Sequence, residues 1–351
     1  MQCSTATDKN AFASWHAPRF NPTVQIMSNG VRIDPRTLPV PQSISPEAQA
    51  MLRRSVNDEG VPLNSLYAMP AADDHDGWRR MQAAVAQNYA ASQVGQAASL
   101  RALVETITVA SATVYRATPA DGAEFAYIDL HGGALVFGGG ENARLAAGRH
   151  ADLHGMTCYG VDYRMPPDYP YPAALDDCMA TYRHVLAHHT PDKIVIGGRS
   201  AGGNLAAATV LRARDEGLPL PAALVLLSPE VDLTESGDSF QVNRTVDVVL
   251  PNPLMSTNLL YAAGAELSHP YLSPLFGDFA KGFPPTFVQS GTRDLFLSNA
   301  VRLHRALRRA EVPVDLHIFE AMPHGGFMGA PEDAELSAEQ VRFVRHWLNR
   351  A

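Results

Sequence analysis

The alternation of apolar and polar residues changes character near residue 104. Residues 104–118, VETITVASATVYRAT, alternate apolar and polar side chains, as an antiparallel strand or hairpin would. Beyond them, short runs that are apolar throughout alternate with amphipathic helical segments. Such runs are typical of strands buried on both faces, so the pattern predicts a mainly parallel sheet covered by helices on both sides. We therefore expect an α/β fold.

Six apolar runs follow the predicted hairpin, and five helical segments separate or follow them. The runs span residues 125–133, 157–164, 193–200, 222–230, 285–292 and 314–320. The helical segments span residues 141–155, 172–189, 201–217, 298–311 and 337–350. In open α/β sheets the chemistry collects at the carboxyl ends of the strands, so candidate functional residues are sought there.

The first hundred residues read differently from the rest. Residues 1–100 are punctuated by prolines and contain helical stretches at 45–55 and 73–92, with no convincing strand. We therefore divide the chain into an N-terminal helical region, residues 1–100, and a second domain, residues 101–351.

A longer segment interrupts the alternation within that second domain. Residues 239–282 separate the fourth apolar run from the fifth, and they carry a helix candidate of their own at 252–264. We interpret the segment as an inserted cap element rather than a linker.

Charge and hydropathy exclude two kinds of partner. The 351 residues include 28 Lys and Arg against 36 Asp and Glu, which gives a net charge of −8 without any run of basic residues. Such a chain has no electrostatic means of holding a phosphate backbone, so we expect no nucleic-acid partner. No window approaches the roughly 18 uninterrupted apolar residues that a membrane span needs, so we expect none.

The cysteines and histidines bear on compartment and cofactor. Cys3, Cys158 and Cys178 cannot all pair and form no C-x-x-C motif, which suits buried free thiols in a reducing compartment. Residues 1–22 lack the basic and apolar regions of a signal peptide, so we expect a cytoplasmic protein. The 13 histidines are scattered and no H-E-x-x-H occurs, so we expect neither a metal nor another cofactor.

A nucleophile motif lies between a predicted strand and an Ala-rich helix. Gly198-Arg199-Ser200-Ala201-Gly202 is a G-x-S-x-G sequence in a strand–turn–helix context, which would strain the serine backbone and project its hydroxyl above the sheet. An ordinary glycine-rich turn is the alternative. A phosphate-binding loop is disfavoured, because neither G-x-x-x-x-G-K-[ST] nor G-x-G-x-x-G is present.

A second glycine-rich segment ends an earlier apolar run. In His131-Gly132-Gly133-Ala134 the glycines leave backbone N–H groups free to point into a cavity. Together with the N–H of Ala201, they would form an oxyanion hole for a tetrahedral intermediate. A loop that only turns the chain is the alternative. We expect His131 to shape this loop without transferring protons.

Taken in order, these motifs resemble one known family. HGGA at 131–134, VDYRMPPDYPYPAALDD at 161–177, GRSAGGNLA at 198–206 and a late HGG at 324–326 resemble the bacterial hormone-sensitive-lipase-like esterases, family IV, of the α/β-hydrolase fold. The resemblance extends from residue 104 to the end. It implies an α/β-hydrolase fold and an N-terminal helical cap, which would suit the first hundred residues. It also implies short- to medium-chain carboxylic esters as substrates, with lactones for some relatives, and homodimers are common in the family.

The general base is sought among the histidines beyond residue 292. His304 and His346 fall on predicted helices and His317 falls inside a predicted strand. Only His324 follows a strand end in a loop, just before the final helix, and the family's late HG motif selects the same residue. We therefore expect His324 to be the base.

The acid that orients the histidine is expected at a strand end between the other two residues. Asp294 follows the run at 285–292 and gives the order Ser, Asp, His found in these hydrolases. Asp232 and Glu230 are the alternatives, because some hydrolases supply the acid from the preceding strand. Asp294 would stabilise the imidazolium of His324, and His324 would deprotonate Ser200.

Two positions depart from the family pattern, and two others follow it. Arg199 stands where relatives carry an acidic residue or threonine, and Glu230 stands where many have an aromatic residue. Because an unpaired buried charge is costly, we expect an Arg199–Glu230 ion pair. The alternative is a solvated Arg199, and attraction of an anionic substrate by Arg199 is disfavoured. By resemblance, Asp162 and Arg164 of the D-Y-R segment would brace the oxyanion loop.

The sequence as a whole predicts a carboxylic ester hydrolase. We expect a serine enzyme that acts through an acyl-enzyme on small uncharged esters, and lactone hydrolysis by the same triad is the alternative. A non-catalytic binder on the same scaffold is disfavoured, because such proteins usually lose a triad residue. Met51, Met69 and Met81 are expected to pack, and to line an adaptable acyl pocket.

Overall fold

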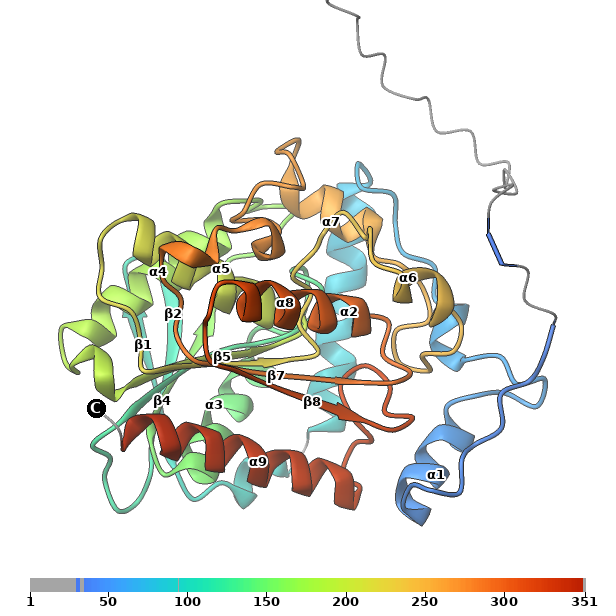
Figure 1. The fold of residues 1–351 in the computed structure, drawn as a ribbon, viewed down its shortest axis with the longest axis horizontal. Helices are drawn as coiled ribbons and strands as arrows, with labels where there is room; N and C mark the ends of the chain where they lie inside the picture. Colours follow the sequence, from blue (N-terminus) through green and yellow to red (C-terminus); the bar gives the residue numbers. More distant parts are fainter. Residues whose placement is uncertain (1–29, 32–34, 94, 350–351) are drawn as a thin grey trace, which may run out of the picture. The chain divides into compact units, whose positions relative to one another are not determined.

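Within the described residues, 30–31, 35–93 and 95–349, eight strands form one mixed sheet in the computed structural model (Figure 1). The chain divides into two units, Met1–Thr37 and Leu38–Ala351, and the elements named below all belong to the second. The strands are β1 Leu103–Val109, β2 Ala112–Thr118, β3 Ala126–Leu130, β4 Thr157–Asp162, β5 Ile194–Arg199, β6 Ala223–Leu227, β7 Thr286–Gly291 and β8 Val314–Phe319.

The sheet is antiparallel at one edge and parallel elsewhere. Its strand order is β1-β2-β4-β3-β5-β6-β7-β8, with β2 antiparallel to both β1 and β4 and all other neighbours parallel. Strands β3 and β7 are buried along their whole length, whereas β1 at the edge is mostly exposed. The predicted hairpin and the mainly parallel sheet are both confirmed.

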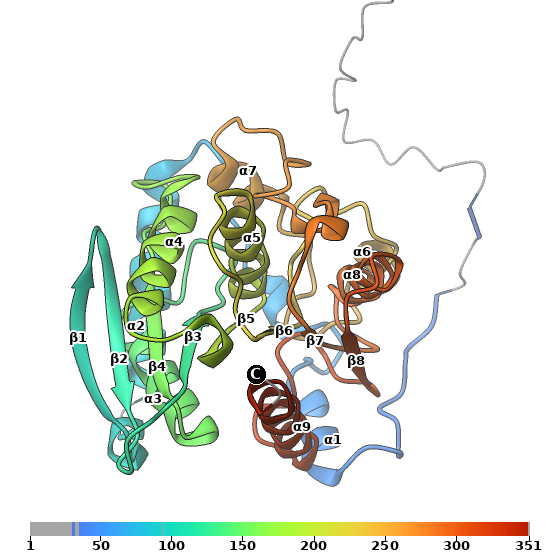
Figure 2. The same cartoon turned by 60° about the vertical axis from the view of Figure 1, so that its left-hand side comes forward.

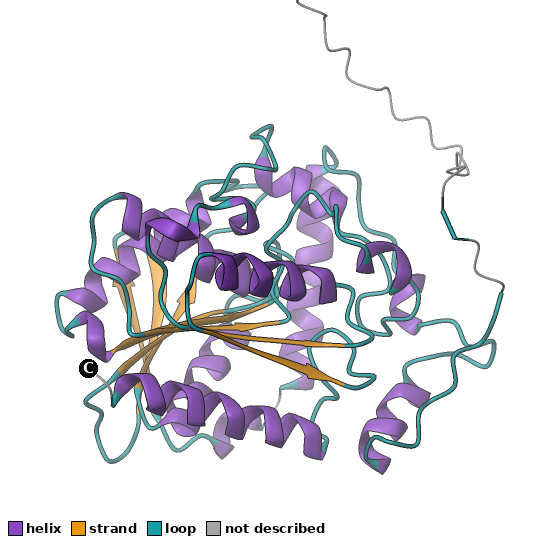
Figure 3. Ribbon diagram, viewed as in Figure 1, coloured by secondary structure: helices purple, strands orange, loops and turns teal. Residues whose placement is uncertain are grey.

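Helices cover both faces of the sheet (Figures 2 and 3). The α-helices are α1 Pro46–Arg54, α2 His75–Ser92, α3 Glu141–His154, α4 Ala173–Leu186, α5 Ala201–Asp215, α6 Ser239–Val242, α7 Met255–Ala262, α8 Leu297–Arg309 and α9 Pro331–Leu348. Short 3₁₀ turns lie at Leu63–Leu66, Gln96–Ser99, Pro191–Lys193, Pro274–Phe276 and Phe279–Lys281. Helix α9 begins six residues before the predicted 337, at a proline suited to a first helical turn.

Two apolar cores result, because successive side chains of a strand point to opposite faces. Ile128 faces the core shared with α4, α5 and α8, while its neighbour Tyr127 faces the core shared with α3 and α9. The same alternation separates Ile196 from Val195 on β5. The pattern fixes which side of the sheet each residue at a strand end will reach.

Helices α1 and α2, which precede the sheet, pack in different places. Helix α1 starts at an N-cap in which the Ser45 hydroxyl accepts from the Ala48 N–H, and its Met51 joins an apolar cluster with Met322. Helix α2 buries Trp78. The division of the chain at residue 100 and the role of the first hundred residues as a cap stay predictions.

Several compositional expectations can be compared with the described part of the chain. Cys158 and Cys178 are buried free thiols, as expected. Cys3 and the rest of residues 1–22, on which the signal-peptide expectation depends, lie outside the described residues. Among the helices that are described, none is long and apolar enough to cross a membrane. Within the described part of the chain, no cluster of three or more His, Cys, Asp or Glu side chains is suited to a metal.

Candidate active site

Ser200 occupies a strained turn between β5 and α5. Its φ of 58° and ψ of −122° lie outside the ordinary regions for an L-residue, as expected for a serine displayed at a sharp strand-to-helix turn. Glycine is required on both sides of it. A Cβ on Gly198 would overlap the carbonyl of Gly202, and one on Gly202 would overlap the carbonyl oxygen of Leu130. The local sequence therefore forces this turn.

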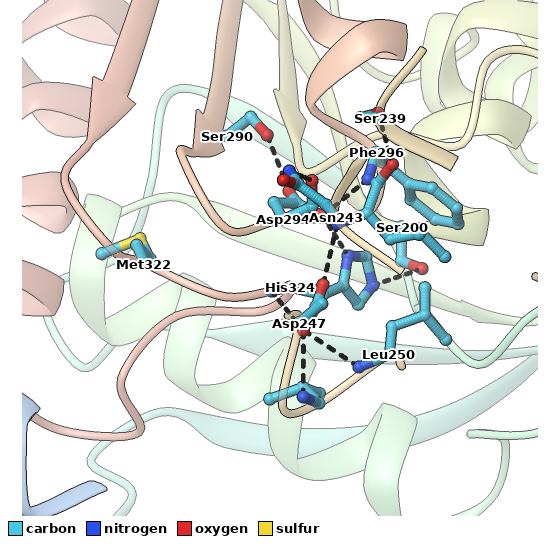
Figure 4. Close-up of polar contacts among 12 residues, drawn as sticks. Ser200, Ser239, Asn243, Asp247, Leu250, Ser290, Asp294, Phe296, Met322 and His324 are labelled. Carbon is cyan, nitrogen blue, oxygen red and sulfur yellow. Dashed lines mark hydrogen bonds and ion pairs between the residues drawn. The ribbon is translucent and has the colours of Figure 1, made fainter. Parts of the chain in front are cut away.

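Three predicted residues meet at the carboxyl edge of the sheet (Figure 4). The Nε2 atom of His324 lies 2.9 Å from the Oγ of Ser200, and its Nδ1 lies 3.1 Å from the Oδ1 of Asp294. Their exposed fractions are 7% for Ser200, 9% for His324 and 0% for Asp294. The line of contacts runs from a slightly exposed hydroxyl to a fully buried carboxylate.

Asp294 is held in its charged form by its surroundings. Burial alone would raise its pKa, but contact with His324 and further hydrogen bonds lower the pKa below its ordinary value. Its Oδ1 accepts from the N–H of Phe296 at 2.9 Å, and its Oδ2 accepts from the hydroxyl of Ser290 at 2.7 Å. The Phe296 ring also packs edge-on against His324, with centroids 4.9 Å apart. These contacts fix the orientation of the imidazole.

The alternative acids and bases lie elsewhere. Asp232 pairs with Arg302 at 2.6 Å and accepts from the hydroxyls of Thr234 and Ser236, and its hydrogen bonds and ion pairs among the described residues do not include His324. Glu230 is fully buried, with Glu235 and Asp232 as its charged neighbours. The other histidines considered are on α8, β8 and α9, respectively: His304, His317 and His346.

The glycine-rich loop after β3 faces the nucleophile. A Cβ on Gly132 would lie 3.0 Å from the carbonyl oxygen of Arg199, so this backbone passes close to the strand-to-helix turn at residues 198–202, which we call the elbow. Gly133 and Ala134 have φ values of 126° and 54°. Among described residues, the hydrogen bonds include none donated by the N–H groups of Gly132, Gly133 or Ala134. These donors are available to a ligand, and the N–H of Ala201 at the start of α5 lies beside Ser200.

The side chains of His131 and Tyr163 pack against each other and contact the start of this loop. The His131 ring stacks on Tyr163, with centroids 4.0 Å apart, and its Nδ1 lies 2.8 Å from the carbonyl oxygen of Gly132. Burial lowers the pKa of His131, so the ring is neutral and suited to a packing role. The Tyr163 hydroxyl donates to the His131 carbonyl at 2.8 Å. Sequence reasoning missed Tyr163, although it lies inside the D-Y-R segment.

Comparison with known proteins shows which family this chain resembles. Residues 127–328 match the family model described as alpha/beta hydrolase fold. An acetyl-hydrolase of Streptomyces hygroscopicus is 34% identical over 224 residues, which cover 63% of this chain and 74% of the relative. An esterase of Acinetobacter venetianus is 32% identical over 196 residues, which cover 55% of this chain and 64% of the relative.

Solved structures extend the match to most of the chain. The crystal structure of esterase E25 superposes with a TM-score of 0.83 and 34% identity, covering 90% of this chain and 98% of that one. An esterase from the bacterial hormone-sensitive lipase family superposes with a TM-score of 0.71 and 30% identity, covering 87% of this chain and 99% of that one. The chain belongs to the bacterial hormone-sensitive lipase family. The α/β-hydrolase fold expected from the sequence is thereby confirmed.

This hormone-sensitive lipase family member does not form the expected ion pair between Arg199 and Glu230. Arg199 lines a small cavity of about 120 Å³ with Asp129 and His150, on the side of the sheet covered by α3 and α9. Glu230 is buried near Asn258 on α7, and no salt bridge joins these two described residues. The prediction was wrong because Arg199 precedes the elbow and points to the opposite face from the residues that follow β6.

Asp162 and Arg164 differ in what they hold. The Oδ2 of Asp162 accepts from the N–H of Gly140 at 2.9 Å and from the hydroxyl of Tyr115 at 3.1 Å, next to the glycine-rich loop of this family member. Arg164 instead donates to Asp177 on α4, with an Nη2–Oδ1 distance of 2.9 Å. Of the two, Asp162 contacts the segment that continues the glycine-rich loop, whereas Arg164 contacts helix α4.

The insertion at 239–282 supplies residues that sequence reasoning missed. The amide of Asn243 donates to the carbonyl oxygen of Asp294 at 2.7 Å. Asp247 is fully buried and accepts hydrogen bonds from backbone on both sides of the site. No local motif marks their contacts to Asp294, Leu295 and His324, because these partners are 48 to 77 positions away in the sequence.

A large cavity of about 850 Å³ lies between α2 and residues 249–254. Met69 and Met81 line it, as does Leu250, which packs against the apolar cluster around Phe296. Met51, by contrast, packs into the cluster with Met322. Two of the three methionines considered therefore line a cavity next to the site.

Proposed function

We propose that this protein hydrolyses carboxylic esters with Ser200 as the nucleophile, His324 as the general base and acid, and Asp294 as the residue that orients the histidine. The observation that carries the proposal is the unbroken line of contacts from the Ser200 hydroxyl through both imidazole nitrogens to the buried carboxylate. Membership of a family with named esterases supports the same reaction class.

Acylation begins at the serine hydroxyl. As the Ser200 Oγ attacks the ester carbonyl carbon, its proton passes to the Nε2 of His324, which becomes an imidazolium. The Asp294 carboxylate stabilises that imidazolium through Nδ1–H. The tetrahedral intermediate then collapses, its C–O bond to the alcohol breaks, and the leaving oxygen takes the proton from Nε2. The products of this half are a free alcohol and an acyl-Ser200 ester.

Deacylation repeats the sequence with water. His324 removes a proton from a water molecule as its oxygen attacks the acyl carbon, and the second intermediate expels the Ser200 oxygen. The proton on Nε2 returns to that oxygen. The carboxylic acid leaves, and the enzyme regains its starting state.

We infer that both intermediates are stabilised by backbone donors. The N–H groups of Gly132, Gly133 and Ala134, together with that of Ala201, would surround the negative oxygen. One such donor is typically worth about 100- to 1,000-fold in rate. The support for this assignment is the availability of the three loop donors and the closeness of Gly132 to the elbow.

The substrate is proposed to be a small uncharged ester of short to medium acyl chain. The cavity between α2 and residues 249–254 is lined by the flexible thioethers of Met69 and Met81, which adapt to varied apolar shapes. A lactone would react through the same steps, with its alcohol still tethered to the acyl group.

The test is turnover of a panel of p-nitrophenyl esters and lactones by wild type and by Ser200→Ala. We expect hydrolysis by wild type and loss of at least about 1,000-fold in Ser200→Ala. Ser65→Ala is the matched control, because the Ser65 hydroxyl donates to the nearby Pro62 carbonyl, and it should retain full activity. Absence of turnover for every ester and lactone by wild type would contradict the proposal.

Three expectations from the sequence remain predictions of our own. These are the homodimer that the family resemblance suggests, a cytoplasmic location and the lack of a nucleic-acid partner. Light scattering of the purified chain tests the first, fractionation of the source cells tests the second, and a gel-shift assay tests the third.

A further inference from the structure

Asp247 occupies the loop between α6 and α7 and is fully buried. Its Oδ1 accepts from the N–H groups of Val249 and Leu250, at 2.9 and 3.0 Å. Its Oδ2 accepts from the N–H of Leu295 at 2.8 Å and from the N–H of His324 at 3.1 Å. Leu295 directly follows the proposed acid, Asp294, and His324 is the proposed base.

These contacts go beyond a loop's local hydrogen bonding. Val249 and Leu250 are close in sequence, so their bonds to the carboxylate make an ordinary turn. The bonds to Leu295 and His324 join segments that are 48 and 77 residues distant. One carboxylate thus ties the acid-bearing loop after β7 to the histidine loop before α9 (Figure 4).

The donors around Asp247 require the charged form of its side chain. Both oxygens face N–H groups, so a proton on either one would have no acceptor and would oppose a donor. Burial and the nearby charge of Asp294 raise the pKa of Asp247, and the backbone donors oppose that rise. The four N–H donors are the reason to assign Asp247 its charged form, as a second carboxylate beside Asp294.

We propose that Asp247 is a positioning residue for the reaction, a second carboxylate that fixes the backbones of His324 and Leu295 and favours the imidazolium formed in each half-reaction. The inference rests on the proposed function of Ser200, His324 and Asp294. Asp247 touches neither the substrate nor the reacting atoms, and it acts through the histidine.

The electrostatic part has a defined sign. A carboxylate near His324 favours its protonated form, so removing the charge of Asp247 makes the imidazolium harder to form. Besides His324, Asp247 is influenced by the charge of Asp294, on the loop after β7, and the charge of Arg199, on the other face of the sheet, acts in turn on Asp294. Both are unchanged in the test, so any shift of the pH profile belongs to position 247.

The test compares Asp247→Asn with wild type by two measurements. The first is the rate at which a fluorophosphonate labels Ser200 across pH 4 to 9, and the second is kcat/KM for a p-nitrophenyl ester over the same range. We expect labelling and kcat/KM to fall about 10- to 100-fold at neutral pH. We also expect the acid limb, where rates fall at low pH, to move to lower pH by at least about half a unit.

Two controls separate this role from a merely structural one. Asn243→Ala removes an uncharged brace from the carbonyl of Asp294, so it should slow both rates without moving the acid limb. Asp278→Asn removes an exposed carboxylate from the same insertion, where the side chain is 55% exposed, and should change neither quantity. Thermal denaturation checks that each variant is folded.

If Asp247→Asn does not fold, Asp247→Ser, which has a smaller uncharged side chain, is measured in the same way. An Asp247 variant that is folded and slow but keeps the wild-type acid limb would overturn the proposal, as would one with wild-type rates. The labelling arm needs no ester. Wild type that is labelled at Ser200 but hydrolyses no ester would contradict the proposed function alone, and the shift of the labelling profile would still decide the role of Asp247.

Discussion

The hydroxyl of Tyr163 donates to the carbonyl oxygen of His131 at 2.8 Å, while the two rings stack with centroids 4.0 Å apart. Tyr163 follows β4 directly and His131 follows β3 directly, and these strands are parallel neighbours. The pair therefore fixes the point at which the glycine-rich loop leaves the sheet. The loop's free N–H groups start from a position set by a buried aromatic side chain.

Removal of the Tyr163 hydroxyl should disturb the glycine-rich loop without creating a cavity in the core. Tyr163→Phe keeps the stacked ring but leaves a buried carbonyl unpaired, so we expect a loss of about 1 to 2 kcal/mol in unfolding free energy. We expect kcat/KM to fall about tenfold, because the oxyanion donors are displaced rather than removed. Urea denaturation and ester kinetics measure the two effects.

Tyr182→Phe is the control for that change. Tyr182 is also buried and donates to the carbonyl of Pro219 at 2.6 Å, away from the site. It should lose about 1 kcal/mol of stability and keep wild-type kinetics. Equal kinetic losses in both variants would show that the Tyr163 contact has no special bearing on catalysis.

The acid of the triad can be distinguished from its rival by a pair of amide substitutions. Asp294→Asn removes the charge that holds Nδ1–H of His324, and kcat should fall about 10⁴-fold. Asp232→Asn breaks a buried contact to Arg302, so it should lower stability while kcat stays within a few-fold of wild type. Steady-state kinetics and thermal denaturation measure both; a comparable kcat loss in Asp232→Asn would count against Asp294 as the sole acid.

An added methyl group at Gly202 should destabilise the turn that carries Ser200. Gly202→Ala would place a Cβ onto the carbonyl oxygen of Leu130, where the backbone of β3 cannot move freely, so we expect a loss of at least about 3 kcal/mol. Gly217→Ala is the comparison, because its φ is 74° but nothing lies within 4 Å of an added Cβ. Its cost should be about 1 kcal/mol, from backbone strain alone. Chemical denaturation measures the free energy of unfolding of both variants. Equal losses in Gly202→Ala and Gly217→Ala would contradict the prediction.

The buried Glu230 makes stability depend on pH. Burial, with the charges of Glu235 and Asp232, raises the pKa of Glu230 from 4.5 to about 8. The unfolded chain then ionises at a lower pH than the fold does, so this group's contribution to stability falls as pH rises from 4.5 toward 8. Glu230→Gln should therefore be more stable than wild type by about 3 kcal/mol near pH 7.

The gain should vanish at acid pH, where both forms are neutral. Unfolding free energies measured from pH 4 to 8 give the comparison, and Glu59→Gln at an exposed position should show no such trend. A gain that does not vary with pH would mean that the amide stabilises the fold through packing alone.

The sequence predicted what depends on neighbours along the chain. Continuous apolar runs marked the buried strands, and Gly198 and Gly202 marked the elbow, because both are consequences of local backbone and burial. His324 and Asp294 could be proposed because each follows a strand end, and strand ends share one edge of the sheet. Their meeting with Ser200 follows from the topology.

The rest depended on contacts without a local signature. Asp247 bonds to backbone N–H groups, which every residue carries, so no sequence pattern shows which ones it will reach. The Arg199–Glu230 pair was wrong for a related reason. Neighbouring strands suggested proximity, but side chains alternate along β5, so Arg199 points to the same face as Val195, the face covered by α3 and α9.

Helix α1 has a consequence for any shortened form of the chain. Ser45 donates to the carboxylate of Glu332 on α9 from both its N–H, at 2.7 Å, and its hydroxyl, at 2.8 Å. Met51 packs with Met322 and Phe327, which flank His324 in the sequence. A protein started at residue 101 would leave this apolar surface open to water beside the histidine. Such a truncation should inactivate by loosening the catalytic base, even though every residue of the triad would remain.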